Sequence, residues 1–87
     1  MEFYNLHKKL ARYFNTKKEL RNANAERTWK DITNTQIELF SALRNNDGEL
    51  IEENIGKIYV SLSKLCEQTH NDPVAVFKNE INRLLKR

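Results

Sequence analysis

Residue types that commonly bind metals are sparse in this 87-residue sequence. Cys66 and His70 lie four positions apart, so one face of a continuous helix would present both to an ion, with His7 or Asp72 as a further ligand. Zinc usually takes four protein ligands, and no second recognisable pair occurs in the sequence. We therefore expect Cys66 to be a small buried apolar group, and we predict no metal ion and no other cofactor.

Residue patterns that perform catalysis are also missing. The sequence contains no GxSxG, HExxH, GxxxxGK or GxGxxG motif. Glu52 and Glu53 are adjacent, and neighbouring residues on a helix point about 100° apart, so their carboxylates cannot share one proton. Both glutamates suit the solvated start of a helix, where negative charge meets the positive end of the dipole. We predict that the protein is not an enzyme.

Basic residues are concentrated near the N-terminus. Residues 1–30 hold eight Lys and Arg against three Glu, whereas residues 31–82 hold four against nine Asp and Glu. This asymmetry could attract an anionic partner or draw two helices of the same chain together. The candidate patch for nucleic acid or another anion comprises Lys8, Lys9, Arg12, Lys17, Lys18 and Arg21. No RNP motif, zinc finger or helix-turn-helix core accompanies it.

Length and composition predict one small globular domain spanning residues 1–87. The hydrophobic share is 39% and the charged share 31%, and only two Gly and one Pro occur, which favours helices over a β fold with many tight turns. No segment reaches the ~20 apolar residues of a membrane span, and no signal peptide is recognised at the start. Cys66 is the only cysteine, and a free thiol suits a reducing compartment, so we expect a cytoplasmic location.

Apolar residues recur with alternating spacings of three and four along four segments, which is typical of helices that pack nearly parallel to one another. We expect each stripe to face a shared core. The stripes are Phe3, Leu6, Leu10 and Tyr13; Trp29, Ile32, Gln36, Leu39 and Leu43, broadened by Phe40; Ile51, Ile55, Ile58, Leu62 and Leu65, flanked by Tyr59 and Cys66; and Val74, Phe77, Ile81 and Leu84.

Turn and cap residues predict where the helices end. The segment NNDG at 45–48 stops one helix, since Asn and Gly tolerate a left-handed backbone, and Asp72 with Pro73 starts the last one. Thr16 and Glu19 fit a capping box for a helix from 17, either continuous or broken near Asn22. The expected fold is an all-α antiparallel up-and-down bundle of three or four helices, at about 2–14, 17–45, 49–69 and 73–86.

Several apolar residues fall off these stripes or at their edges, and they are the candidate contacts for a partner protein. A contiguous exposed patch would mark an interface, and a self-complementary patch would make a homodimer. The candidates are Tyr4, Phe14, Ile37, Val60, Val76 and Leu85.

Residues 37–87 resemble the pediocin-like bacteriocin immunity proteins. The shared features are an acidic loop before a helix of IxxIYxxLxKL type, a polar loop with DP, and a helix containing INRL. The resemblance implies a cytoplasmic four-helix bundle that protects a bacterium by engaging a bacteriocin-bound receptor. In that family a further long helix and a recognition tail follow the INRL-like helix, whereas this chain ends at Arg87. No individual functional residue is therefore carried over.

These observations predict a small non-enzymatic cytoplasmic protein that acts by protein–protein binding, as a bacteriocin immunity protein or as an inhibitor from a phage or mobile element. The alternative is a nucleic-acid-binding regulator that uses the basic N-terminal helix.

Overall fold

The computed structural model describes residues 2–16 and 24–86, and within them four helices follow one another along the chain. They are α1 (Glu2–Thr16), α2 (Ala25–Arg44), α3 (Gly48–Gln68) and α4 (Pro73–Leu85). The all-α, bundle-like class is confirmed, and three of the expected helices begin and end within two residues of their predicted bounds. The expected helix start at 17 and the break near Asn22 lie outside the described residues.

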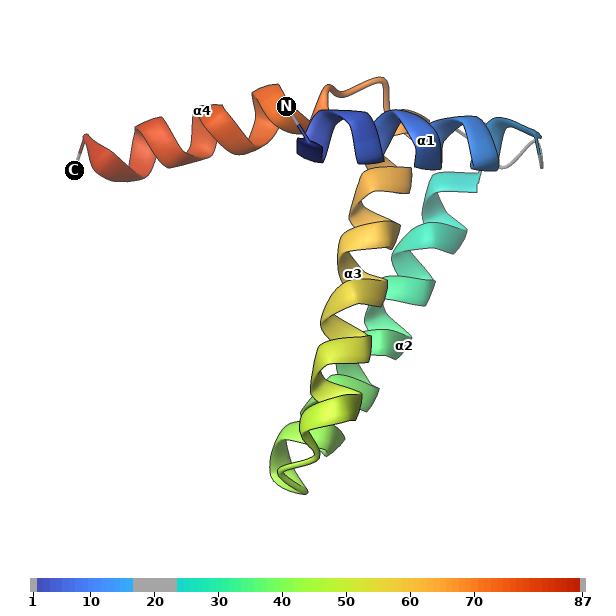
Figure 1. The fold of residues 1–87 in the computed structure, drawn as a ribbon, viewed down its shortest axis with the longest axis vertical. Helices are drawn as coiled ribbons and strands as arrows, with labels where there is room; N and C mark the ends of the chain where they lie inside the picture. Colours follow the sequence, from blue (N-terminus) through green and yellow to red (C-terminus); the bar gives the residue numbers. More distant parts are fainter. Residues whose placement is uncertain (1, 17–23, 87) are drawn as a thin grey trace.

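α2 and α3 form an antiparallel hairpin, which is the central unit of the fold (Figure 1). The turn between them depends on Asn46, whose φ of 55° is the left-handed conformation that asparagine tolerates. The Asp47 side chain then accepts a hydrogen bond from the Leu50 amide at 3.2 Å and so caps the first turn of α3. Asn46 therefore takes the role that the NNDG segment predicts, and Gly48 is already the first helical residue.

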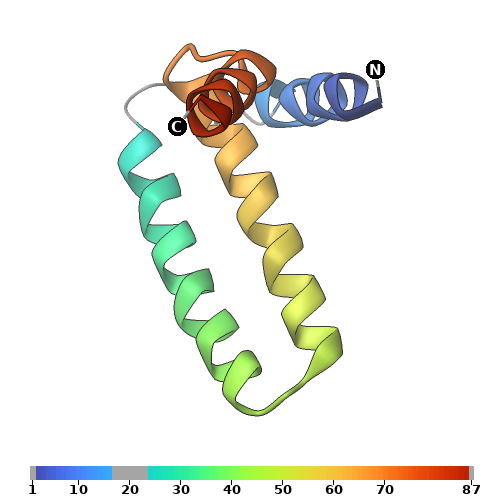
Figure 2. The same ribbon diagram turned by 90° about the vertical axis from the view of Figure 1, so that its left-hand side faces the viewer.

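α1 and α4 lie across one end of the hairpin rather than alongside it (Figure 1). They project to opposite sides, so the molecule has the outline of a T, and α4 points along the line of sight in Figure 2. The radius of gyration is 14.4 Å, whereas a compact domain of this length would have about 12 Å. The chain is therefore open.

The prediction that each apolar stripe faces a core within the chain is wrong for most of the stripe residues. The packed faces of α2 and α3 hold Thr28, Ile32, Ala42, Asn54 and Gln68, all buried. Most large apolar side chains of the predicted stripes are instead exposed: Phe3, Leu6, Tyr13, Trp29, Phe40, Leu43, Ile55, Tyr59, Leu62, Phe77, Ile81 and Leu84. In α2 and α3 the stripes extend over two faces of the helix, and only one of these faces is covered.

Across the described residues, no helix is long and apolar enough to cross a bilayer.

Candidate functional site

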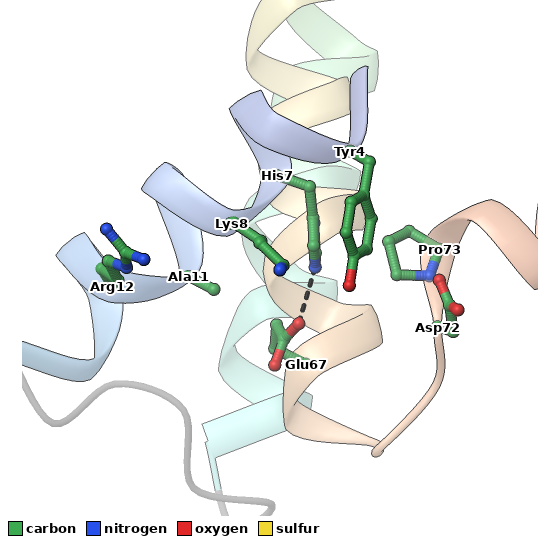
Figure 3. A pocket seen from close by; sticks show the side chains of 8 residues that line it. All are labelled: Tyr4, His7, Lys8, Ala11, Arg12, Glu67, Asp72 and Pro73. Carbon is green, nitrogen blue, oxygen red and sulfur yellow. Dashed lines mark hydrogen bonds and ion pairs between the residues drawn. The ribbon is translucent and has the colours of Figure 1, made fainter. Parts of the chain in front are cut away.

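His7 joins α1 to α3. Its ring is buried, with Nε2 2.6 Å from Glu67 Oε1 and Nδ1 hydrogen-bonded to the Ser63 hydroxyl (Figure 3). In the neutral ring, Nε2 donates to the carboxylate and Nδ1 accepts from the hydroxyl, so both nitrogens are occupied. Phe14, two turns further along α1, is also buried, with Lys64 Nζ 4.8 Å from its ring centroid. α1 is thus held against α3 by a polar contact, and its apolar stripe of Phe3 and Leu6 is left exposed.

An open cavity of about 390 Å³ lies where α1, the end of α3 and the start of α4 meet (Figure 3). Its walls carry charges of both signs, since Lys8 and Arg12 come from α1 while Glu67 and Asp72 lie opposite. Lys8 Nζ sits 4.6 Å from the ring centroid of Tyr4, which also lines the cavity. Among the described residues, no cysteine or serine lines the cavity.

Cys66 lies near this junction but is poorly suited to chemistry. Its thiol is half-buried, and burial, followed by the negative charges of Glu67 and Asp72, raises its pKa above the ordinary value of 9.0. The thiolate is the reactive form, and little of it is present at neutral pH. His70 lies beyond the end of α3 in a left-handed conformation, with φ 59°, so the continuous helix needed for a Cys66–His70 metal pair is not formed. The described residues contain no group of three or more side chains that could hold a metal ion.

The most distinctive surface lies on the α2–α3 hairpin. In each helix a second apolar stripe runs about 90° from the stripe that packs against the other helix. Viewed along each helix from its N-terminus, the second stripe is rotated in the same sense from the packed stripe. Because α2 and α3 are antiparallel, the two second stripes therefore lie on the same side of the hairpin. We call this surface the apolar face. It comprises Trp29, Gln36, Phe40 and Leu43 of α2, and Ile55, Tyr59, Leu62 and Cys66 of α3.

The apolar face carries larger side chains than those that are fully buried inside the hairpin. The exposed fractions of Trp29, Phe40 and Tyr59 are 56%, 61% and 64%. By contrast, the fully buried side chains between α2 and α3 are Thr28 and Gln68, and the largest buried aliphatic residue is Ile32. Large apolar groups are normally the ones removed from water, so this exposed face is the candidate contact surface of the molecule.

α4 adds a further uncovered surface. Its start is fixed by Asp72, whose carboxylate accepts a hydrogen bond from the Val74 amide at 3.0 Å, and by Pro73 at the first helical position, as the sequence predicts. No residue of α4 is buried. The Asn71 amide donates a hydrogen bond to the Cys66 carbonyl at 2.8 Å, so α4 starts close to the apolar face. The helix projects away from the side that holds α1 (Figures 1 and 2).

The six predicted partner-contact residues do not form one patch. Phe14 is buried against α3 and offers no free surface, which corrects that prediction. Tyr4 lines the cavity, and Ile37, Val60, Val76 and Leu85 are exposed on three helices outside the apolar face. The sequence pattern does not reveal the apolar face, because the spacing of its residues predicts an internal core. The available clue was the width of the stripes, since Phe40, Tyr59 and Cys66 broaden them beyond what one helix contact can cover.

Among the predicted basic patch, Lys8, Lys9 and Arg12 lie on exposed positions of α1. Lys17, Lys18 and Arg21 lie outside the described residues.

Comparison with family models, with curated proteins and with solved structures finds no match to this chain. The function is therefore argued from the geometry above.

Proposed function

We propose that this protein acts by binding another protein chain through the apolar face, without catalysing a reaction. The observation that carries the proposal is the exposure of Trp29, Phe40 and Tyr59 on one side of a hairpin that fully buries few large apolar side chains. Burying such a face releases water from apolar area at about 25 cal/mol per Å², which is the usual driving force of protein association.

A non-enzymatic role agrees with the state of the reactive groups. Both nitrogens of His7 are engaged by Glu67 and Ser63, and the Cys66 thiol has a raised pKa. A nucleophilic cysteine normally has a lowered pKa, and the raised pKa of Cys66 does not meet that description.

Bacteriocin immunity and inhibition by a phage or mobile-element protein are two forms that this binding could take. The first depends on the resemblance of residues 37–87 to immunity proteins, and both place the chain in the cytoplasm, where Cys66 would remain reduced.

The test is photo-crosslinking in the cell of origin. A photoreactive phenylalanine analogue at Phe40 should give one discrete protein adduct, because that side chain would contact the bound chain. The same analogue at Asn34, an exposed position on the opposite side of α2, is the matched control and should give none. No adduct at either position, or equal labelling at both, contradicts the proposal.

The second candidate is nucleic-acid binding through α1. The observation that favours it is the exposure of Lys8, Lys9 and Arg12 on a helix that projects from the hairpin. Three phosphate contacts would make log affinity fall with log salt at a slope of about −3 for duplex DNA, and Lys8→Glu with Arg12→Glu would abolish binding. The control is Lys57→Glu on α3, and affinity that is flat with salt removes this candidate.

A further inference from the structure

We infer that the apolar face is occupied by a second copy of this chain, so that two hairpins form a two-fold symmetric four-helix bundle. The inference depends on the proposed function and names its partner. Four observations support it: the accessible area, the polar groups buried inside the hairpin, the symmetry of the face and the direction of α4.

The accessible area matches what a stable homodimer removes. The chain exposes 7062 Å², whereas a folded monomer of 10.3 kDa is expected to expose about 5,400 Å². The excess is about 1,700 Å² per chain. Obligate dimers bury about 1,000–2,500 Å² from each partner, and a standard transient complex buries about 800 Å². Burial of this excess by each of two copies would lower the exposed area per chain to that expected of a folded monomer.

The hairpin is poorly built to stand alone. Thr28 and Asn54 are buried between or beside its helices, and no hydrogen-bond partner for Asn54 Oδ1 is found within the described residues. A two-helix contact of this kind buries little apolar area to offset the entropy of ordering both helices. Layers of Trp29, Phe40 and Leu62 from each of two copies would supply the missing core.

The face is suited to pairing with itself. Four antiparallel helices pack at about 20° with their apolar stripes inward, and two hairpins of equal length meet this geometry through a two-fold axis. α2 and α3 have 20 and 21 residues, so each spans about 30 Å.

Charges at the rim of the face also complement one another. Arg44 would face Glu26 of the second copy if the axis is perpendicular to the helices, and Glu52 of the second copy if it is parallel to them. Either two-fold arrangement thus pairs opposite charges, whereas an unrelated partner would need a separately evolved complement.

α4 forms a second wall for the same occupant. It has 13 residues, leaves the hairpin beside Cys66 and carries the exposed stripe of Phe77, Ile81 and Leu84. A hairpin seated on the apolar face would lie in the corner beneath this helix (Figure 2). One second copy would therefore cover both the apolar face and the stripe of α4.

Sedimentation equilibrium of the full chain is the direct test. The wild-type protein should sediment at twice the chain mass of 10.3 kDa throughout the micromolar range. The fluorescence of Trp29, the single tryptophan, should be blue-shifted there and move to the red when dilution dissociates the dimer. A helical wild-type protein that stays at the monomer mass at all these concentrations overturns the inference.

Phe40→Glu should weaken self-association by about 100-fold or more, because it replaces an aromatic ring of the interface by a carboxylate that is costly to remove from water. Asn34→Glu adds the same charge on the opposite side of α2 and should leave the dimer intact; equal weakening by both variants contradicts the inference. The crosslink at Phe40 separates the two proposals. An adduct at twice the chain mass supports self-pairing, and an adduct of another mass overturns self-pairing alone. Absence of any adduct contradicts protein binding itself.

Discussion

His7 shows how one polar residue can decide the placement of a helix. The spacing of Phe3, Leu6 and Leu10 predicts that an apolar stripe docks α1, yet the buried residues of this helix are His7 and Phe14. The ring of His7 meets a hydroxyl and a carboxylate of α3 at once. A buried imidazole with two partners of this kind is a strong constraint on position, since leaving either partner without its bond has a free-energy cost.

We predict that His7→Ala releases α1 from α3. Loss of the bonds to Ser63 and Glu67 should cost about 1–3 kcal/mol of local stability, because the buried groups lose their partner. Amide hydrogen exchange would measure this as lost protection in α1 while α2 stays protected. Lys9→Ala, at an exposed position of the same helix, is the control, and unchanged protection of α1 in His7→Ala would contradict the assignment.

Cys66 should react slowly with alkylating agents. Its pKa is raised first by burial and then by the charges of Glu67 and Asp72, which lowers the thiolate fraction at neutral pH. The alkylation rate should therefore rise at a higher pH than it does for a free cysteine. The folded state holds this proton more tightly than the unfolded state, so the contribution to stability is present below pH 9.0 and is lost as pH rises further. Iodoacetamide kinetics against pH, with urea-unfolded protein as reference, would check this, and equal profiles would refute it.

The helices themselves follow from local chemistry. Asp47 and Asp72 cap α3 and α4 through their carboxylates, and Asn46 ends the α2 region in the left-handed conformation. Each of these positions can be identified from the sequence, because caps and turns depend on residues close in the chain. The relative placement of α1 and α4 depends on contacts between distant residues and could not be read in this way.

We predict that Asp72→Ala destabilises α4 and so speeds amide hydrogen exchange in this helix. Loss of the bond to the Val74 amide should cost about 1 kcal/mol, and α4 has no buried residue of its own to offset the loss. Hydrogen exchange in α4 should become faster, whereas Asp72→Asn, which keeps an acceptor, should change little. Equal exchange in all three proteins would show that the cap does not support this helix.

The whole molecule is open in a way that a single small domain rarely is. Its hairpin exposes large apolar side chains, and α1 and α4 extend to either side (Figure 1). Marginal stability is expected of a chain of this size that buries so little apolar area. Association would then be part of folding, because each copy would complete the core of the other.

The midpoint of thermal unfolding should accordingly rise with protein concentration. For a dimer of two 87-residue chains, a 100-fold increase should raise Tm by about 7 °C. Circular dichroism at several concentrations would measure it, with Phe40→Glu as the variant whose midpoint does not move. A concentration-independent midpoint for the wild-type protein would contradict coupled folding and association.

The sequence by itself determined the helical class, the start of α4 and the turn at 45–47, because periodicity and capping are local properties of the chain. It also identified the apolar stripes, but it did not determine which of them are buried inside the chain. Trp29, Phe40 and Leu62 have the spacing of a core, and only the tertiary structure showed that they lie on the outer side of the hairpin. The reason is physical: periodicity reports that a face avoids water, whereas the molecule that covers the face is decided by contacts distant in sequence or in another chain.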